Sequence, residues 1–198
     1  MTRPTTQSAD RKREKAIRAA TEMFATQGVA GTSMRMIAGS IDILPGSLYK
    51  YISSKDSLLE EIVLSHLVMM HREFRAIVDQ KLPPVAELTQ LITRSLELIQ
   101  KDPYTPEIFR NEESAIRKLP RYDEIHTLTA DNHALWIDSI ERGVTAGAYR
   151  PDIDARTIYS LMRDGLWMTG RWFTPTKNYT LADLSNECVH LYLGGIIT

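Results

Sequence analysis

The sequence predicts an all-α fold of nine helices. Apolar residues recur with helical spacing along almost the whole 198-residue chain, no stretch alternates as a strand does, and prolines separate the periodic segments. Three short helices are expected before residue 55 and six longer ones after it. Hydrophobic residues make up 43% of the chain, which is enough to bury the core of one large domain or two small ones.

Composition also limits the class of protein. The chain has no apolar run of 18 or more residues, so we expect no membrane span, and its first residues lack the hydrophobic stretch of a signal peptide. A single cysteine, Cys188, excludes an intramolecular disulfide framework. These features favour a cytoplasmic protein.

Charge is distributed unevenly along the chain. Residues 1–56 contain nine Lys or Arg and five Asp or Glu, whereas residues 57–198 contain 15 and 20. A basic segment joined to an acidic body suggests a polyanionic partner for the first segment only. Chance can also produce an excess of this size, so the inference depends on a recognition motif in the same segment.

The basic segment is predicted to hold three short helices and the start of a long one. Apolar spacing indicates a helix from about residue 9 that stops at Gly28. Thr32-Ser33 can cap a second helix, SMRMIAGS. A turn around Asp42 leads to a third helix, PGSLYKYI, and Ser53-Ser54 can cap a long helix of about residues 55–80.

The stretch LPGSLYKY, residues 44–51, is unusual for a core helix. Leu48 and Ile52 are four apart and are expected to face inward, which leaves the polar side chains on the outer surface. Tyr hydroxyls and Lys50 can donate to phosphate oxygens, Ser47 or Lys50 can reach base edges, and Gly46 allows close backbone approach. A helix-turn-helix in the major groove explains these residues; the alternative is a solvated helix carrying amphipathic tyrosines.

Residues 12–64 resemble the DNA-binding segment of the TetR family of bacterial repressors. The matching features are A-x-x-x-F in a helix that ends at a Gly, T-S at a cap, I-A in the second helix, G-S-L-Y-K-Y in the third and S-K-D-x-L-L at the start of the fourth. The resemblance implies a helix-turn-helix DNA-binding domain, residues 1–54, and an effector-binding and dimerisation domain, residues 55–198, in a homodimer that represses transcription from a palindromic operator. It implies DNA contact for Ser33, Arg35, Tyr49, Lys50, Tyr51 and Lys55, and the chemistry of the stretch adds Pro45, Gly46 and Ser47 to these candidates.

Two positions depart from the family pattern. Asp42 stands in the turn between the helices where the family usually has Gly, and Ile41 stands where it favours a small residue. Asp tolerates a left-handed backbone better than most residues, so we expect the turn to form at a cost of about 1 kcal/mol or less.

The last two helices, about residues 155–173 and 180–197, are predicted to form the dimer interface. The resemblance implies a four-helix interface made from these helices of two chains, and both helices are apolar over more of their surface than one core requires. The expected interface residues are Leu161, Trp172, Leu184, Cys188, Leu191 and Tyr192. The alternative is that these residues complete the core of a single chain.

The C-terminal half contains the run R-D-x-x-W, followed by R-W and a closing L-G-G-I. In these residues it resembles the actinobacterial repressors of cholesterol-ring catabolism, and the resemblance implies as effector a CoA thioester (an acyl-CoA) of a steroid or lipid breakdown product. Arg163 and Trp167 are four apart on one helix face, and an Arg in an otherwise apolar helix needs an anion. The candidate effector-binding residues are Arg163, Trp167, Arg117, Arg121, Trp136, Phe109, Met162 and Met168.

Alternatives stay open for the effector and its residues. Arg163 could instead pair with Asp164 of a partner chain or with the Glu112-Glu113 pair, and Trp136 and Trp172 could serve packing alone. The alternative effector is a lipophilic drug, in which case the protein would control an efflux gene.

Catalytic and metal signals are weak. The chain has no phosphate loop, nucleophile elbow or catalytic Cys/His set, so we predict neither an enzyme nor a cofactor. His126 and His133 are seven apart and could share a helix face, but without a third ligand we expect no metal site. The acidic pairs Glu60-Glu61 and Glu112-Glu113 are expected to be solvated surface.

Overall fold

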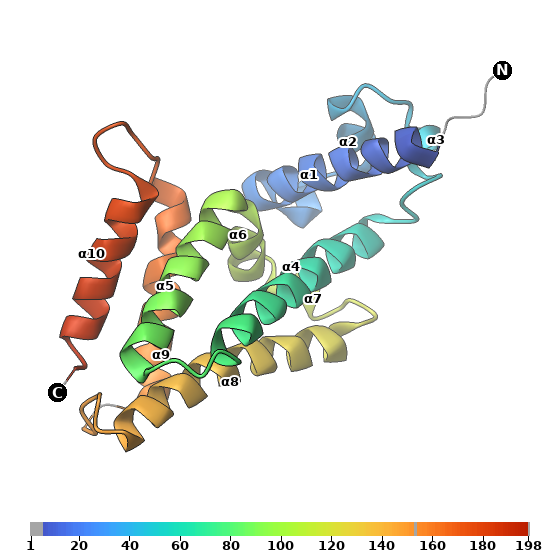
Figure 1. Cartoon of the computed structure of the whole chain (residues 1–198). Coiled ribbons are helices and arrows are strands. Elements are labelled where there is room, and N and C mark those ends of the chain that lie inside the picture. Colours follow the sequence, from blue (N-terminus) through green and yellow to red (C-terminus); the bar gives the residue numbers. More distant parts are fainter. Residues whose placement is uncertain (1–5, 153, 198) are drawn as a thin grey trace. The chain divides into compact units, whose positions relative to one another are not determined.

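The computed structural model describes residues 6–152 and 154–197, and these residues form ten helices (Figure 1). The helices are α1 (Thr6–Gly31), α2 (Met34–Ser40), α3 (Pro45–Leu48), α4 (Lys55–Val78), α5 (Pro84–Lys101), α6 (Tyr104–Asn111), α7 (Glu113–Ile116), α8 (Tyr122–Thr145), α9 (Ala155–Trp172) and α10 (Leu181–Gly194). The predicted all-α fold is confirmed. None of the helices in these residues combines the length and the apolar character that crossing a bilayer needs.

The count of ten rather than nine helices arises at Glu112. The sequence spacing favours one helix between Pro106 and Pro120, but α6 ends at Asn111 and α7 begins at Glu113. Glu112 itself has φ −115° and ψ 24°, and its Oε1 accepts a hydrogen bond from the Val29 N–H at 3.0 Å. The expectation that Glu112 is solvated surface is therefore wrong, and the helix divides where this side chain turns towards α1.

The chain divides into two compact units. Unit 1 contains the described residues up to His66 together with Tyr104–Ile125, and unit 2 contains Leu67–Pro103 and the described residues from His126 onward. The first half of α4, with α6 and α7, thus packs in the same unit as α1–α3. The functional boundary between residues 54 and 55 stays a prediction, because these units describe packing and not function.

Unit 1 has a small apolar centre. Ala20 and Phe24 of α1, Ile37 of α2, Leu48 of α3 and Ile52 after it are all buried. α1 packs against α2 and along α6, and α2 packs against α3. The inward orientation predicted for Leu48 and Ile52 is confirmed.

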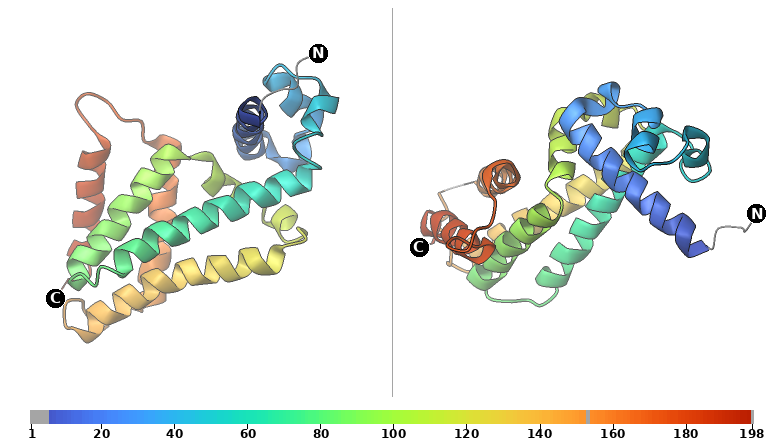
Figure 2. Two further views of the ribbon diagram at one scale, coloured as in Figure 1. Left: turned by 45° about the vertical axis from the view of Figure 1, so that its right-hand side comes forward. Right: turned by 90° about the horizontal axis from the view of Figure 1, so that it is seen from above.

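Unit 2 holds the larger core. α5 packs against both α9 and α10, and Figures 1 and 2 show these last two helices running antiparallel beside it. The apolar side of α5, with Leu88, Leu91, Ile92 and Leu96, is fully buried in this core. At the far end of α8, Gly143 leaves room for the buried ring of Tyr149, since a Cβ at residue 143 would lie 2.1 Å from two ring carbons.

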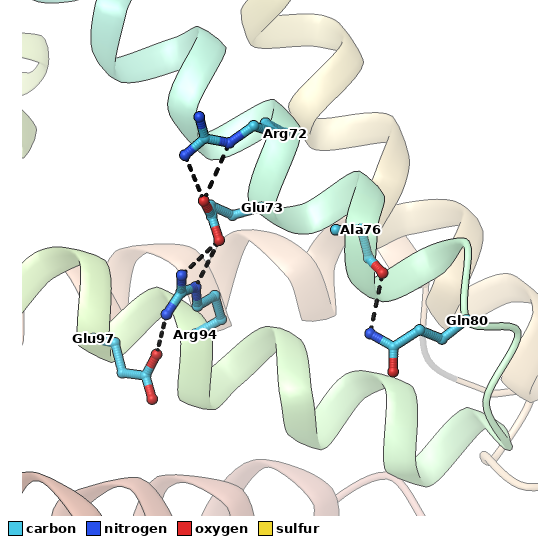
Figure 3. A network of polar contacts seen from close by, with 6 residues as sticks. All are labelled: Arg72, Glu73, Ala76, Gln80, Arg94 and Glu97. Carbon is cyan, nitrogen blue, oxygen red and sulfur yellow. Dashed lines mark hydrogen bonds and ion pairs between the residues drawn. The ribbon is translucent and has the colours of Figure 1, made fainter.

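Charged side chains tie α4 to α5 within unit 2 (Figure 3). Glu73 of α4 accepts hydrogen bonds from Arg72 at 2.7 Å and from Arg94 of α5 at 2.5 Å, and Arg94 also donates to Glu97 at 2.5 Å. These donated hydrogen bonds, from Arg72 first and then Arg94, hold the pKa of Glu73 below its ordinary value. The carboxylate therefore stays charged and holds the two helices together.

Candidate DNA-binding and effector sites

The turn between α2 and α3 is built by a Schellman motif. Ile43 N–H donates to Ala38 O at 3.0 Å and Asp42 N–H donates to Gly39 O at 3.2 Å, which closes the end of α2. Asp42 adopts φ 55°, the left-handed conformation that its side chain tolerates. The departure from Gly at this position is thus accommodated, and α3 begins three residues later.

The helix after the turn is shorter than predicted. Regular α-helix covers only Pro45–Leu48. The next turn is tighter, with hydrogen bonds three residues apart from Lys50 N–H to Ser47 O and from Tyr51 N–H to Leu48 O. Tyr49 is 54% exposed, Lys50 and Gly46 are exposed, and no atom lies near the position of a Cβ on Gly46. Pro45, Ser47 and Tyr51 are half-buried, so the side chains predicted to contact DNA form one outward surface after the turn.

Two of the predicted DNA contacts also hold the backbone of unit 1. Ser33 is the N-cap of α2, and its Oγ accepts a hydrogen bond from Met36 N–H at 3.2 Å. Lys55 donates through Nζ to Val29 O at 2.6 Å and to Thr32 O at 3.0 Å. Lys55 therefore caps the end of α1, which a search for phosphate-binding residues in the sequence does not anticipate.

Further exposed residues of unit 1 were not singled out from the sequence. Arg11, Lys12 and Lys15 are exposed on the first half of α1, and the positive balance of this segment was the available signal. Leu44, directly before α3, is 77% exposed. An exposed apolar side chain beside α3 is of the kind that can contact a thymine methyl group.

Arg163 forms an aromatic stack in unit 2. Its guanidinium carbon lies 5.7 Å from the ring centre of Tyr159 and 5.9 Å from that of Trp167, one helical turn to either side on α9. Tyr159 continues the cluster to α8, with ring centres 5.1 Å from His133 and 5.9 Å from Trp136. The structure thus brings Arg163, Trp167 and Trp136 together, as the sequence predicted, and adds Tyr159 and His133.

The charge of Arg163 persists despite partial burial. Burial, the largest single cause, lowers the pKa of the guanidinium, but the Asp164 carboxylate, which accepts from Nε at 2.8 Å, and Tyr159 together outweigh it, and the net pKa is raised. Asp164 is the partner that the sequence offered as an alternative, here from the same chain. The pKa of His133 is lowered, first by burial and then by the Arg163 charge, so this imidazole is neutral near pH 7.

Other predicted effector residues lie elsewhere. Phe109, Arg117 and Arg121 belong to unit 1, where Phe109 packs its ring 6.0 Å from His66. Arg117 pairs with Glu113 at 2.5 Å, and Arg121 pairs with Glu124 at 2.7 Å. In unit 2, Met162 is buried in the core and Met168 is 38% exposed, on the side of α9 opposite Arg163.

The outer faces of α9 and α10 carry an apolar surface. Leu161, Trp172 and Leu191 are 67%, 62% and 73% exposed, and Met168 shares the α9 face with the first two. Leu184 instead lies in the core of the chain, and Cys188 and Tyr192 pack against that core. The Tyr192 hydroxyl occupies the space that a Cβ on Gly165 would need. Three of the six predicted interface residues therefore face outward and three face inward.

The Glu60-Glu61 pair bonds to other elements of unit 1. Glu60 accepts from Arg121 N–H at 2.9 Å and Glu61 pairs with Arg13 at 2.6 Å, so these half-buried side chains remain partly exposed to solvent, as expected, but also have protein partners. Over residues 6–152 and 154–197, no three His, Cys, Asp or Glu side chains converge as a metal site would require.

Comparison with known proteins identifies similar chains. Residues 16–62 match the model of the family "Bacterial regulatory proteins, tetR family". The chain is 31% identical over 185 residues to the HTH-type transcriptional repressor KstR2 of Mycolicibacterium smegmatis, covering 93% of this chain and 90% of that protein. KstR2 of Mycobacterium tuberculosis is 30% identical over 93% of this chain and 92% of its own length.

Comparison with solved structures also identifies KstR2 as a similar protein. The ketosteroid transcriptional regulator KstR2 of Mycobacterium tuberculosis superposes with a TM-score of 0.87 and 29% identity, over 94% of this chain and 95% of that one. AibR, solved in complex with isovaleryl coenzyme A and operator DNA, superposes with a TM-score of 0.76 over 91% of this chain and 97% of that one. AibR is only 18% identical, so it shows a shared fold alone.

Proposed function

We propose a function from the premise that this chain belongs to the TetR family of bacterial transcription regulators. It is therefore a DNA-binding transcriptional repressor and not an enzyme. Our proposal concerns the signal: a CoA thioester of a steroid or lipid breakdown product releases the protein from a palindromic operator. The surface of Arg35, Pro45–Ser47 and Tyr49–Tyr51 carries the DNA contacts.

One observation carries the effector assignment. Arg163 keeps its charge while stacked between two aromatic rings in a half-buried position, which suits a ligand with both phosphates and an apolar ring. The similarity to KstR2, described as a ketosteroid regulator, supports a steroid-derived acyl group. AibR, which shares this fold, was solved with isovaleryl coenzyme A, and this supports an acyl-CoA as the class of effector.

The alternative effector is a lipophilic drug. Sites for such cations are typically lined by acidic or aromatic side chains, whereas the cluster on α8 and α9 is centred on a cation. A cationic ligand would be repelled by Arg163, so this cluster favours the thioester.

The effector test is a thermal shift with four additives: a steroid-ring acyl-CoA, its free acid, CoA alone and ethidium as a lipophilic cation. The thioester should raise the Tm of the wild type and of Arg156→Met, an exposed control on the same helix. Arg163→Met should lose most of that shift. If ethidium raises the Tm and the thioester leaves it unchanged, the drug-sensor assignment is favoured instead.

We further propose that the outer faces of α9 and α10 form the dimer interface. Leu and Trp side chains that are exposed on two helices packed against α5 are costly to leave in water, which supports an interaction surface here. Leu161→Glu with Leu191→Glu should reduce the mass measured by light scattering from twice to once the 22.5 kDa chain. Val68→Glu, at another exposed apolar residue, should leave the dimer intact, and a dimeric Leu161→Glu/Leu191→Glu variant would refute this interface.

A further inference from the structure

The end of α1 is held by side chains from two other elements of unit 1. Gly28 has φ 80° and ψ 158°, which interrupts the helical hydrogen-bond ladder of α1. Val29 N–H donates instead to Glu112 Oε1 at 3.0 Å, while Val29 O accepts from Lys55 Nζ at 2.6 Å. Thr32 completes the turn by donating through its hydroxyl to Gly28 O at 2.9 Å.

Glu112 approaches this turn closely. It stands at the break between α6 and α7, and α6 packs along α1. A Cβ on Gly28 would lie 2.9 Å from Glu112 Oε1, so glycine is required both for the positive φ and for this approach. Val29 and Thr32 are only 6% and 2% exposed, so their backbone groups depend on protein partners.

The turn directs the DNA-binding helices. Only Thr32 and Ser33 separate α1 from α2, and α2 leads through the four-residue turn to α3. A change in the direction of the last turn of α1 therefore changes the orientation in which Arg35, Tyr49 and Lys50 are presented.

We propose that Glu112 is a positioning residue for operator recognition, which holds the Val29 amide and so fixes α2 and α3 in the orientation that matches the major groove. The inference rests on the DNA-binding surface proposed above. Glu112 does not contact DNA in this role, since a carboxylate is repelled by phosphate.

The sign of the effect separates positioning from simple electrostatics. Removing a negative charge from a DNA-binding protein raises its affinity for DNA if charge alone matters. Removing the carboxylate that holds Val29 should instead lower specific binding, because the buried N–H loses its acceptor and the turn relaxes. Glu113 is the matched control, because it carries the same charge at the next position but pairs on the surface with Arg117 at 2.5 Å.

The test measures binding to an operator selected from a random duplex library and to a scrambled duplex, by fluorescence anisotropy below the melting temperature. Glu112→Ala should lower the ratio of specific to non-specific affinity about tenfold, in keeping with an unsatisfied buried donor. Glu112→Gln, whose amide oxygen can still accept, should restore most of the ratio. Glu112→Asp keeps the charge, but its side chain is one methylene shorter, so it should also lower the ratio of specific to non-specific affinity. It replaces Glu112→Ala if that variant does not fold.

An unchanged ratio in Glu112→Ala, or an equal fall in Glu113→Ala, would overturn the positioning role. Tyr49→Ala with Lys50→Ala is measured on the same two duplexes. If that double variant still binds the operator, the proposed DNA surface is wrong. If the double variant loses operator binding while Glu112→Ala binds as the wild type does, only the role of Glu112 is wrong.

Discussion

Unit 1 and unit 2 use their charged side chains differently. In unit 1, Lys55 and Glu112 bond to distant backbone groups at the end of α1, beside side-chain ion pairs such as Arg13–Glu61, while Arg35 and Lys50 are exposed. In unit 2, the long-range bonds of the carboxylates Glu73 and Glu87 join side chains. Charged groups thus fix the backbone at the end of α1 while other cations of unit 1 face outward, as the proposed DNA-binding surface requires.

The buried carboxylate of Glu87 in unit 2 is satisfied internally. Glu87 is 3% exposed and accepts from Ser139 at 2.5 Å and from Arg142 at 2.6 Å. The Arg163 cluster differs from this pattern, because its cation is stacked on rings and its carboxylate partner, Asp164, is 65% exposed. This arrangement fits the proposed role of Arg163 in binding the effector.

The largest effect should come from the exposed surface of unit 1. Tyr49→Ala with Lys50→Ala should weaken operator binding on the order of 100-fold or more, since each side chain acts twice in a dimer and such contacts contribute about 1–3 kcal/mol. The Tm should change little, because Tyr49 is 54% exposed and Lys50 is also exposed. Electrophoretic mobility shift and thermal melting of the same preparation measure both quantities.

The control for this variant is a lysine of unit 2. Lys177→Ala, in the loop between α9 and α10, removes a charge of the same kind from an exposed position. Operator affinity close to wild type in Lys177→Ala would assign the loss to the surface after the turn. An equal loss in both variants would mean that total charge, and not this surface, governs binding.

The interior of unit 2 should respond in the opposite way. Gly143→Ala should destabilise the protein by about 3 kcal/mol, because the new Cβ would lie 2.1 Å from two carbons of the buried Tyr149 ring. That ring has little freedom to move, since Tyr149 is 1% exposed and its hydroxyl donates to Pro84 O at 2.7 Å. Urea unfolding measures the change.

Gly194→Ala supplies the comparison for Gly143. No atom lies within 4 Å of a Cβ at residue 194, which is at the end of α10, so the substitution should be neutral or stabilise by up to about 1 kcal/mol. Similar stabilities for the two variants would show that Tyr149 rearranges at little cost.

The local geometry of the proposed DNA-binding surface could be predicted because its residues are close in sequence. The cap at Ser33, the turn at Asp42 and the inward Leu48 and Ile52 all follow from local rules, and the structure has each of them. The role of Lys55 could not be predicted in the same way, because its partners are 23 and 26 residues away and are backbone carbonyls. Backbone acceptors leave no signature in the sequence.

Long-range contacts also explain the other differences. Glu112 interrupts a helix that local spacing favours, because its acceptor role involves Val29, 83 residues earlier. The Arg163–Trp167 pair follows from spacing on one helix, whereas His133 joins it from α8 through the Tyr159 ring. Leu184 and Leu191 share a helix and a residue type, yet only packing of α10 on α5 decides that the first is buried and the second exposed.

A smaller effect is expected from the ion pairs between α4 and α5. Arg94→Met should lower the free energy of unfolding at pH 7 by about 1 kcal/mol or less, because the Arg94 side chain is 39% exposed. The pKa of Glu73 is lowered in the folded state, so its contribution is present above its unfolded pKa and is lost as the pH falls through the folded value. Wild type and Arg94→Met should therefore converge in urea titrations at acidic pH, and a constant difference would exclude Glu73 as the partner that matters.

The smallest effect should be seen at His133, where the cluster around Arg163 meets α8. Its pKa is lowered in the folded state, so the unfolded chain binds more protons below about pH 6.5 and the folded state loses stability as the pH falls through this range. Arg163→Met should raise the pKa of His133 but leave it below 6.5, because burial is the larger cause and remains in the variant. Proton NMR titration, with His133→Gln to assign the resonance, measures the shift. An unchanged pKa would show that the Arg163 charge does not reach the imidazole, and the two residues would then not form one site.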